Sequence, residues 1–360
     1  MRHINKIQKI LQPHFKCDKR RLKFIASFVV SLVRARTVTL SNLSVIFNPK
    51  VKSESNYRRM QRFFENYMMD YLQISKLVIS SLPHVNFILT LDRTNWQFGK
   101  KDINILLLAL VYKNISIPLC WELLNKRGNS SFEERKEIVS RGLAILGKRR
   151  IKCLVADREF GSGKFFRYLK KAEINLHIRI KKTSIITKYK SKVSDVTTML
   201  SHLKLHKYMV VPGKRIIYNE EVYLSGKKTV GNDYLIIASS SNPNEAIAMY
   251  KQRWTIENLF GNMKTKGFNL ENTHIKDDEK LKKLIALLTI AMLWCYLIGL
   301  WIESSIKIRI KNHGRKEKST FRKGLDHFTK ILNSVENLIF ELDCVFKVLS
   351  CTLSPESIIE

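Results

Sequence analysis

Short apolar stretches edged by basic residues run through the first 83 residues, and their spacing predicts helices. The stretch 22–33 is apolar with basic edges, and a second helix is predicted over 55–82. Residues 39–43 (TLSNL) have the composition of a turn that leads into a small DNA-binding helix. The pattern therefore predicts an all-helical region over 1–83.

From residue 84 the apolar positions change to a strand-like period. Apolar runs predict three strands over 85–91, 103–112 and 115–121, the first ending at Asp92 and the last two joined by a tight turn at Lys113-Asn114. Ser131 and Glu134 have the spacing of a capping box, so a helix is predicted from there to about Leu146. A strand over 151–156 ending at Asp157, a helix over 161–172 and a strand over 176–181 follow. This order of elements is that of a ribonuclease-H-like α/β fold.

A polar, turn-rich segment over 183–232 interrupts the alternation. It contains short β-like runs at 208–211, 215–218 and 221–224, which predict a β-rich insertion. The run 234–239 returns to the core. Asn242-Pro243-Asn244-Glu245 then predicts a helix start, with Asn242 as the N-cap, Pro243 at the first helical position and Glu245 at the third.

Residues 284–302 form a stretch of 19 residues without a charge. That length is sufficient to span a bilayer. The same composition also suits a helix that is buried on all sides in a large core, and this second interpretation is the favoured one because no other segment of this kind exists in the chain.

The charge balance indicates a polyanionic partner. The chain has 64 Lys and Arg against 31 Asp and Glu, a formal net charge of +33. Such an excess is difficult to keep on a compact protein unless its partner is a polyanion, and nucleic acid fits best. Arg58, Arg59 and Arg62 lie on the predicted helix over 55–82, and phosphate contact and plain solvent exposure are both open for them. The basic stretch 306–324 leaves the same two options open.

The six cysteines are scattered, with no CxxC pair. They are interpreted as reduced thiols of a cytoplasmic protein rather than as a disulfide framework or a zinc site. The basic, polar N-terminus shows no signal peptide. A cytoplasmic, nucleoid-associated bacterial protein is therefore expected.

Three carboxylates are the candidates for catalysis. Asp92 and Asp157 each follow a predicted strand, and Glu257 lies on the predicted helix that begins near Asn242. Ends of strands in mixed sheets gather ligands and metals, so the three are expected to converge. Clustered carboxylates need cations between them, and hard oxygen ligands favour Mg²⁺, which Mn²⁺ can replace. Two such ions could support phosphodiester cleavage.

Four polar residues of the same predicted helix share one face. With Tyr250 at zero, Arg253, Glu257 and Lys264 fall at roughly 300°, 340° and 320°, a stripe about 60° wide. Trp254 falls on a different side and is interpreted as a core residue. A carboxylate flanked by two cations and a phenol suits a metal ion bound to a phosphodiester.

Together these motifs resemble a known family. Asp92-x-Thr94-x-Trp96, Asp157-Arg158-x-Phe160 and Tyr250-x2-Arg253-x3-Glu257-x6-Lys264 are similar to motifs of DDE insertion-sequence transposases, above all those of the insertion sequence 4 family with its Tyr-Arg-Glu-Lys signature. The resemblance covers about residues 85–325. It implies that Asp92, Asp157 and Glu257 hold the metal ions, and that Tyr250, Arg253, Lys264 and Arg158 contact DNA, although Arg158 could equally be a structural ion-pair partner.

The resemblance also implies an activity and partners. The expected function is cut-and-paste DNA transposition through a hairpin, on terminal inverted repeats and target DNA, by a homodimer in a paired-end complex and without a membrane. Relatives that form hairpins stack a flipped base on an aromatic of the insertion, often Trp. No Trp lies within 183–240, and Tyr208, Tyr218 and Tyr223 are the substitutes there.

The predicted organisation is a DNA-end-binding region over 1–83, a core in two parts over 84–182 and 233–303, the insertion over 183–232 and a basic C-terminal region over 304–360. Three other functions stay open. The same site could serve a ribonuclease-H-like nuclease, the chain could be a domesticated, non-catalytic DNA-binding relative, or the stretch 284–302 could belong to a membrane protein.

Overall fold

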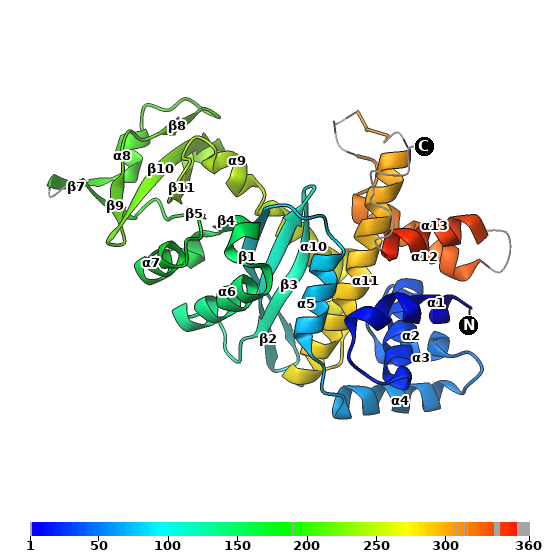
Figure 1. Cartoon of the computed structure of the whole chain (residues 1–360). Coiled ribbons are helices and arrows are strands. Elements are labelled where there is room, and N and C mark those ends of the chain that lie inside the picture. Colours follow the sequence, from blue (N-terminus) through cyan, green and yellow to red (C-terminus); the bar gives the residue numbers. More distant parts are fainter. Residues whose placement is uncertain are drawn as a thin grey trace. The chain divides into compact units, whose positions relative to one another are not determined.

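The computed structural model describes residues 2–188, 191–306, 309–312, 314, 316–334 and 339–350. The chain divides into two compact units (Figure 1). The first unit contains Met1–Pro83, Trp96–Lys101 and Leu259–Glu360, and the second contains His84–Asn95 and Asp102–Asn258. The boundaries predicted from the sequence divide the chain by function, and they stay predictions.

A large mixed β-sheet forms the centre of the second unit, so the predicted α/β class is confirmed. Its first five strands are β1 (Phe87–Phe98), β2 (Lys101–Tyr112), β3 (Ile115–Leu123), β4 (Ile151–Ala156) and β5 (Leu176–Arg179). They lie in the order β3-β2-β1-β4-β5. Strands β2 and β3 are antiparallel, whereas β4 runs parallel to both β1 and β5. The order of strands and helices agrees with the prediction.

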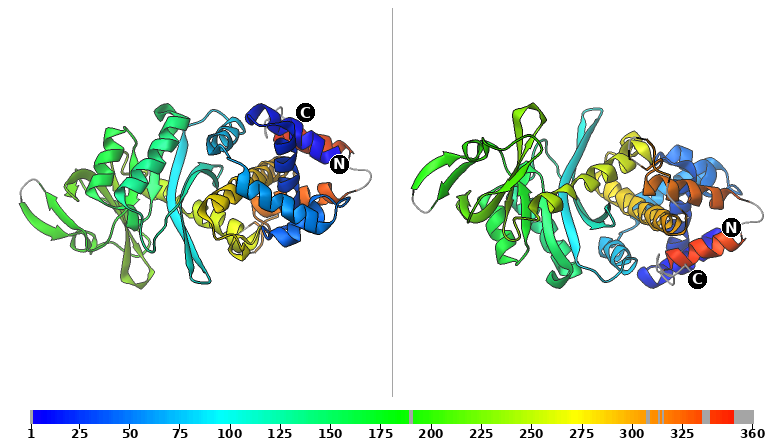
Figure 2. Two further views of the ribbon diagram at one scale, coloured as in Figure 1. Left: turned by 90° about the horizontal axis from the view of Figure 1, so that it is seen from below. Right: turned by 90° about the horizontal axis from the view of Figure 1, so that it is seen from above.

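Local sequence signals set several boundaries of this sheet. Lys113 and Asn114 have φ of 46° and 60°, the left-handed values that a two-residue hairpin turn requires. Helix α6 (Phe132–Leu146) begins with the predicted capping box, in which the Ser131 side chain accepts from the Glu134 amide. It packs against β3 and against α7 (Gly163–Lys171), and Figure 2 shows both helices beside the strands. A 3₁₀ turn, Lys148–Arg150, joins α6 to β4.

The predicted end of the first strand at Asp92 is wrong, because β1 continues to Phe98. Beyond Asp92 the burial still alternates: Thr94 and Trp96 are buried, while Asn95 and Gln97 are exposed. A β-branched and an aromatic residue on the buried face continue the strand. Asp92 therefore lies within β1 and not at its end.

The insertion extends the same sheet rather than forming a separate one. Strand β11 (Asp233–Ser239) pairs antiparallel with β5 on one side and with β10 (Glu220–Thr229) on the other. Strand β10 also pairs with β8 and β9. The remaining elements of this region are β6 (Ile185–Lys188), β7 (Ser191–Asp195), α8 (Val196–Leu200), β8 (Tyr208–Val210), β9 (Arg215–Ile217) and a 3₁₀ turn, Val230–Asn232.

The helix predicted to carry the polar stripe is interrupted and starts later than expected. Its parts are α9 (Ala246–Lys251), α10 (Trp254–Gly261) and a π-helical segment, Asn262–Lys266. Asn242 does not cap the helix, since its φ is 45° and residues 243–245 form a turn. Between α9 and α10 the amides of Gln252 and Arg253 bond carbonyls three residues back, at 3.0 Å each. Such bonds wind the backbone more tightly than an α-helix.

The first unit is helical, as predicted for 1–83, but the helix over 55–82 is broken in two. Its N-terminal helices are α1 (Arg2–Leu11), α2 (Lys19–Ala35), α3 (Leu40–Phe47), α4 (Ser53–Asn66) and α5 (Tyr71–Ser80), with a 3₁₀ turn at Gln12–His14. Tyr67 is extended, and Asp70 caps α5 by accepting from the Leu72 amide at 2.9 Å. The Asp70 cap pairs a backbone amide at the start of α5, and this stabilises two separate helices in place of one continuous helix.

The uncharged stretch belongs to α11 (Asp278–Ser305), whose most apolar window of 18 residues is 89% buried inside the protein. By length and composition it is the one single helix of the described residues that could cross a membrane, and its burial is what the core-helix interpretation expects. Helices α2, α5, α12 (Thr320–Asn333) and α13 (Ile339–Leu349) pack around it, and a 3₁₀ turn, Leu270–Asn272, precedes it. Gly299 and Gly324 allow close contact of α11 with α12, because a Cβ at Gly324 would lie 1.7 Å from the Cys295 carbonyl oxygen.

Candidate active site

Two of the three candidate carboxylates lie on neighbouring parallel strands. Leu91 of β1 is paired with Ala156 of β4, so the residues that follow them, Asp92 and Asp157, are adjacent across the sheet. Glu257 lies on α10. The side chains differ in exposure, from 15% for Asp92 to 52% for Glu257. The sheet register thus brings the two aspartates together, as the strand pattern predicted.

Arg253 and Tyr250 connect all three carboxylates. The Arg253 guanidinium lies 3.2 Å from Asp92 Oδ2 through Nη1 and 2.8 Å from Glu257 Oε1 through Nη2. Its Nε donates to the Tyr250 hydroxyl at 3.0 Å, and that hydroxyl donates to Asp157 Oδ1 at 3.0 Å. Both linking side chains are buried. One guanidinium and one phenol therefore bridge the three acids.

Burial and neighbouring charges shift the pKa values of this cluster. Burial raises the pKa of Asp92 to about 6; the Arg93 amide and Arg253 oppose the rise, and Glu159 and Asp157 add to it. Burial also raises the pKa of Tyr250. Burial by itself lowers the pKa of Arg253. The neighbouring Tyr250, Glu257 and Asp92 raise this pKa by more than burial lowers it, so the net shift is upward. Arg253 is thus a permanent cation within the cluster.

The donor set has the chemistry of a divalent-cation site. Carboxylate oxygens are hard ligands, and this cluster links three carboxylates through one guanidinium and one phenol. Within the described residues, however, no three acidic, His or Cys side chains are arranged to hold a metal ion. The Arg253 guanidinium bridges Asp92 and Glu257 and provides the counter-charge. The oxygen donors fit a metal ion, and Arg253 would have to share or leave its position for one.

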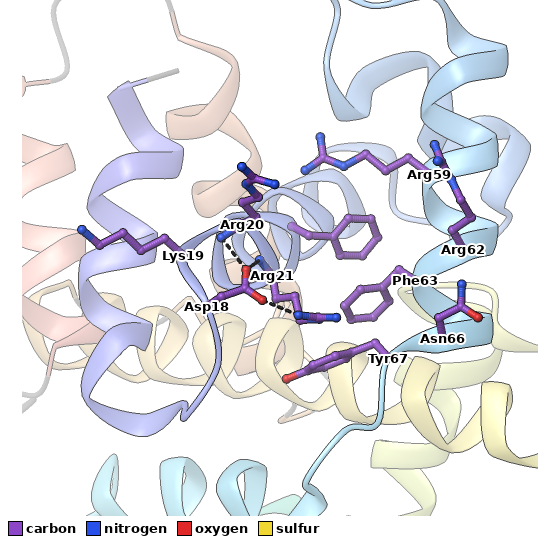
Figure 3. A pocket seen from close by; sticks show the side chains of 10 residues that line it. Asp18, Lys19, Arg20, Arg21, Arg59, Arg62, Phe63, Asn66 and Tyr67 are labelled. Carbon is purple, nitrogen blue, oxygen red and sulfur yellow. Dashed lines mark hydrogen bonds and ion pairs between the residues drawn. The ribbon is translucent and has the colours of Figure 1, made fainter.

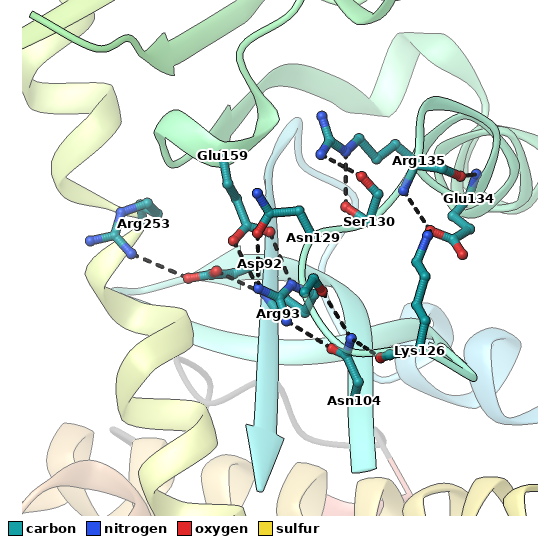
Figure 4. Close-up of polar contacts among 12 residues, drawn as sticks. Asp92, Arg93, Asn104, Lys126, Asn129, Ser130, Glu134, Arg135, Glu159 and Arg253 are labelled. Carbon is teal, nitrogen blue, oxygen red and sulfur yellow. Dashed lines mark hydrogen bonds and ion pairs between the residues drawn. The ribbon is translucent and has the colours of Figure 1, made fainter. Parts of the chain in front are cut away.

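A second polar network fixes the strand segment that carries Asp92 (Figure 4). Arg93 binds Glu159 through two bonds of 3.2 Å each, from Nε and from Nη2. Its Nη1 donates to Asn104 Oδ1 at 3.0 Å, and Asn104 donates to the carbonyls of Lys126 and Gly128. Glu159 belongs to the 3₁₀ turn Arg158–Phe160, directly after Asp157. The Arg93–Glu159 pair thus ties the neighbourhood of Asp92 to that of Asp157.

Replacing Glu159 by glutamine is expected to lower the free energy of unfolding by about 1–3 kcal/mol, because a partly buried charged partner of Arg93 is lost. Denaturant unfolding of the purified protein measures it. The matched control is Glu133→Gln, since Glu133 is 75% exposed and lies 3.7 Å from Lys136. The control should change stability by less than about 0.5 kcal/mol. Equal effects of both substitutions would contradict a structural role for the Arg93–Glu159 pair.

Buried hydroxyl groups anchor α10 to the sheet. Thr255 Oγ1 lies 2.6 Å from Ser116 Oγ on β3, and Ser116 lies 3.4 Å from Thr90 on β1. All three residues are buried. The helix that carries Glu257 is therefore linked to the strand that carries Asp92 through the Ser116 hydroxyl of β3.

The other two predicted DNA-binding residues, Arg158 and Lys264, lie in different surroundings. Arg158 is exposed, and no carboxylate is paired with it among the described residues. Lys264 belongs to the first unit, where it lies 2.6 Å from Glu271 and over the Trp96 ring. The stripe predicted for one helix therefore holds for Tyr250, Arg253 and Glu257 within the second unit. Lys264 lies in the π-helical segment that follows α10, and its place in the stripe stays a prediction.

The interpretation of Trp254 as a core residue is wrong, because its side chain is 64% exposed. On α10, Trp254, Glu257 and Asn258 are exposed, whereas Thr255, Ile256 and Leu259 are buried. Positions three and four apart share a helix face. The tight turn before α10 shifts its register relative to α9, and Trp254 shares the outer face with Glu257.

Trp254 borders a hollow of about 820 Å³ in the second unit. Tyr250 and Arg253 also line it, together with cationic residues of β5, the insertion and α9: Arg179, Lys227 and Lys251. Leu235 and Ile247 supply an apolar part of the wall. The hollow thus combines cations, an exposed indole and an apolar surface beside the candidate carboxylates.

Several residues of the site could not be selected from the sequence. Arg179 lies 3.7 Å from Asp157 Oδ1, and Asn104 is buried beneath Arg93. Proximity in sequence was a signal for Arg93 and Glu159, since they stand one and two residues after the candidate aspartates. For Arg179 and Asn104 the chain offered no such signal.

Comparisons with known proteins point to one kind of domain. Residues 134–294 match a family model described as "Transposase DDE domain". That match spans less than half of the chain; it includes Asp157 and Glu257 but not Asp92. No curated protein matches the sequence.

Among solved structures, the cryo-EM structure of the piggyBac transposase synaptic complex with hairpin DNA is similar over 100% of this chain and 86% of that chain, with a TM-score of 0.47 and 13% identity. At a TM-score below 0.5 this likeness carries no conclusion about fold or activity. The family match supports a DDE-type transposase domain in this chain.

Proposed function

We propose that the protein is a DNA transposase of the insertion sequence 4 type, with a ribonuclease-H-like core that cleaves DNA and transfers the cut strand. The observation that supports it most is the placement of Asp92 and Asp157 on adjacent parallel strands, with Glu257 joined to them through Arg253 and Tyr250. The strand order β3-β2-β1-β4-β5 and the family match support the same assignment.

Divalent metal ions, Mg²⁺ with Mn²⁺ as a substitute, are proposed as the cofactor. Asp92, Asp157 and Glu257 would hold them, and the ions would activate a hydroxyl nucleophile and stabilise the leaving oxygen. Arg253 now supplies the positive charge between Asp92 and Glu257. A bound ion would take over that charge and leave the guanidinium to contact a phosphate.

Tyr250, Arg253, Lys264 and Arg158 are proposed to contact the DNA near the cut bond. The exposed Arg158 side chain directly follows Asp157, and Arg253 carries five N–H donors in a planar fork that suits phosphate oxygens. The net charge of +33 supports a nucleic-acid partner. Terminal inverted repeats and target DNA are the proposed substrates, bound by a homodimer that pairs two ends in the bacterial cytoplasm, next to the nucleoid.

The proposal is tested with purified full-length protein, Mg²⁺ and a labelled duplex that carries the terminal repeat of the element encoding it. Cutting at the repeat boundary that requires the metal ion is the expected result. A joined product with target DNA separates a transposase from a nuclease of the same fold, which would leave cut ends only. Specific binding without any cutting, in Mg²⁺ and in Mn²⁺, would favour a non-catalytic relative.

A hairpin step is the finer part of the proposal, and the exposed Trp254 supports it. Strand folding into a hairpin needs an aromatic face on which an unstacked base can lie. Tyr218 is bound to the Ser184 hydroxyl at 2.9 Å, whereas Trp254 and Tyr208 are 64% and 60% exposed. Only Trp254 of these two lines the hollow with Tyr250 and Arg253. It is the preferred stacking partner.

Replacing Trp254 by alanine is expected to slow hairpin formation roughly 5- to 150-fold, since base–aromatic stacking contributes about 1–3 kcal/mol. The first nick should keep its rate. Trp254→Phe retains a ring and should recover most of the loss, and Tyr208→Ala is the matched control in the insertion. Denaturing gels separate nicked from hairpin ends. A hairpin defect in Tyr208→Ala with none in Trp254→Ala would assign the stacking to the insertion instead.

A further inference from the structure

Helices α2 and α4 of the first unit enclose a hollow of about 790 Å³, termed here the α2–α4 hollow (Figure 3). Cationic side chains surround it from both helices: Lys19, Arg20 and Arg21 from the first turn of α2, and Arg59 and Arg62 from α4. The side chains of all five are exposed. The hollow is therefore a concentrated positive surface that the candidate active site does not include.

One carboxylate lies within this cluster, and it is already occupied. Asp18 caps α2 by accepting from the amides of Arg20 and Arg21 at 2.9 Å each, and it pairs with the Arg21 guanidinium. Among the described residues, the structure pairs no carboxylate with Lys19, Arg20, Arg59 or Arg62. Four cations thus face the hollow without a compensating charge, which favours an anionic occupant.

The floor of the hollow is a stack of aromatic rings. Phe24 and Phe63 are stacked with centroids 4.0 Å apart, and Phe63 lies 4.9 Å from Tyr67. The Arg59 guanidinium lies over Phe24 and that of Arg21 over Tyr67, at 5.7 Å and 5.5 Å. The rings restrict where these two guanidinium groups lie, so Arg59 and Arg21 are arranged before an anion arrives.

The shape of the site selects the part of a nucleic acid that it fits. Reading base edges in the major groove requires an element that protrudes into the groove. A concave surface instead receives a ridge, and the ridge of a duplex is its sugar–phosphate strand. Guanidinium and ammonium groups at the rim match phosphates, while an apolar floor matches deoxyribose. Contacts of this kind position DNA without reading its sequence.

We propose that the α2–α4 hollow binds the sugar–phosphate backbone of duplex DNA independently of sequence, through Lys19, Arg20, Arg59 and Arg62. This inference rests on the proposed function, because it assigns one place on the chain where the substrate DNA is held. It adds a second DNA contact surface, in a different unit from the carboxylates.

The test is fluorescence anisotropy of the full-length protein with a labelled duplex of arbitrary sequence, titrated at several salt concentrations. For Arg59→Gln/Arg62→Gln, the slope of log affinity against log salt is expected to become less steep by about 1.8, or about 0.9 for each lost phosphate contact. Arg59→Lys/Arg62→Lys keeps both charges and should keep the native slope. Circular dichroism and thermal unfolding show that each variant is folded.

The matched control removes two exposed cations at the start of α4 and on it that do not line the hollow, Lys52→Gln/Arg58→Gln, and should leave the slope within about 0.5 of the native value. An equal change in both double variants would overturn the inference, since overall charge alone would then explain it. A native slope in Arg59→Gln/Arg62→Gln would overturn it as well. Either result would leave the proposed function standing if the native protein cuts repeat DNA. If the native protein binds duplex DNA through this hollow but does not cut repeat DNA, the proposed function is contradicted and the binding surface is not.

Discussion

Asparagine in place of Asp157 is expected to reduce DNA cleavage by about 10³-fold or more while the protein stays folded. The expected loss equals about 4 kcal/mol of transition-state stabilisation, a size that a missing charged metal ligand can account for. The structure makes this substitution mild in every other respect. An asparagine oxygen can still accept from the Tyr250 hydroxyl, which lies 3.0 Å from Asp157 Oδ1, and only the weaker contact with Arg179 at 3.7 Å loses its charge partner.

The measurement is single-turnover cleavage of labelled repeat DNA with Mg²⁺, beside thermal unfolding of each variant. Asp233→Asn is the matched control, because Asp233 is a half-buried partner of Lys182 at 3.9 Å in the same unit. The control should cut at close to the native rate. If Asp157→Asn cut as fast as the control, Asp157 would not be a metal ligand and the proposed chemistry would need another site.

The elements of this fold that the sequence predicted are those with local signals. The capping box at Ser131 and Glu134 defines the start of α6, and Lys113-Asn114 defines the hairpin between β2 and β3. The end of β4 at Asp157 was likewise predicted, since an apolar run stops at a charge. Such signals act over four residues or fewer, and packing elsewhere in the chain does not change them.

The parts that were predicted wrongly depend on contacts between distant segments. Helical spacing alone places Trp254 in the core, but the tight turn at 252–253 gives α10 its own register. Thr255 then reaches Ser116 of β3, and Trp254 is left on the outer face. The convergence of Asp92 and Asp157 was predicted because parallel strands impose it. The bridging role of Arg253 was not, because it depends on the side chains of three separate elements.

The contribution of Asp92 to the stability of the metal-free protein is expected to fall as the pH rises from about 4 to about 6. The pKa of Asp92 is raised by burial to about 6, above the ordinary value of 3.8. Between these two values the native state holds the Asp92 proton and the unfolded chain has lost it. The contribution of Asp92 to the free energy of unfolding therefore falls with rising pH across this window and is constant above it.

Comparison with Asp92→Asn isolates this one group, because the variant keeps a neutral side chain of the same shape at every pH. The variant should gain stability over the native protein as the pH passes from 4 to 6, to as much as about 3 kcal/mol above pH 6, at 1.36 kcal/mol for each pH unit between the two pKa values. Denaturant unfolding with a chelator present measures the difference. Excess Mg²⁺ should reverse the order, since an ion held by Asp92 stabilises the native protein and not the variant. A stability difference that does not vary with pH between 4 and 6 would contradict the raised pKa of Asp92, and would show that its carboxylate is already ionised in the native protein across this range.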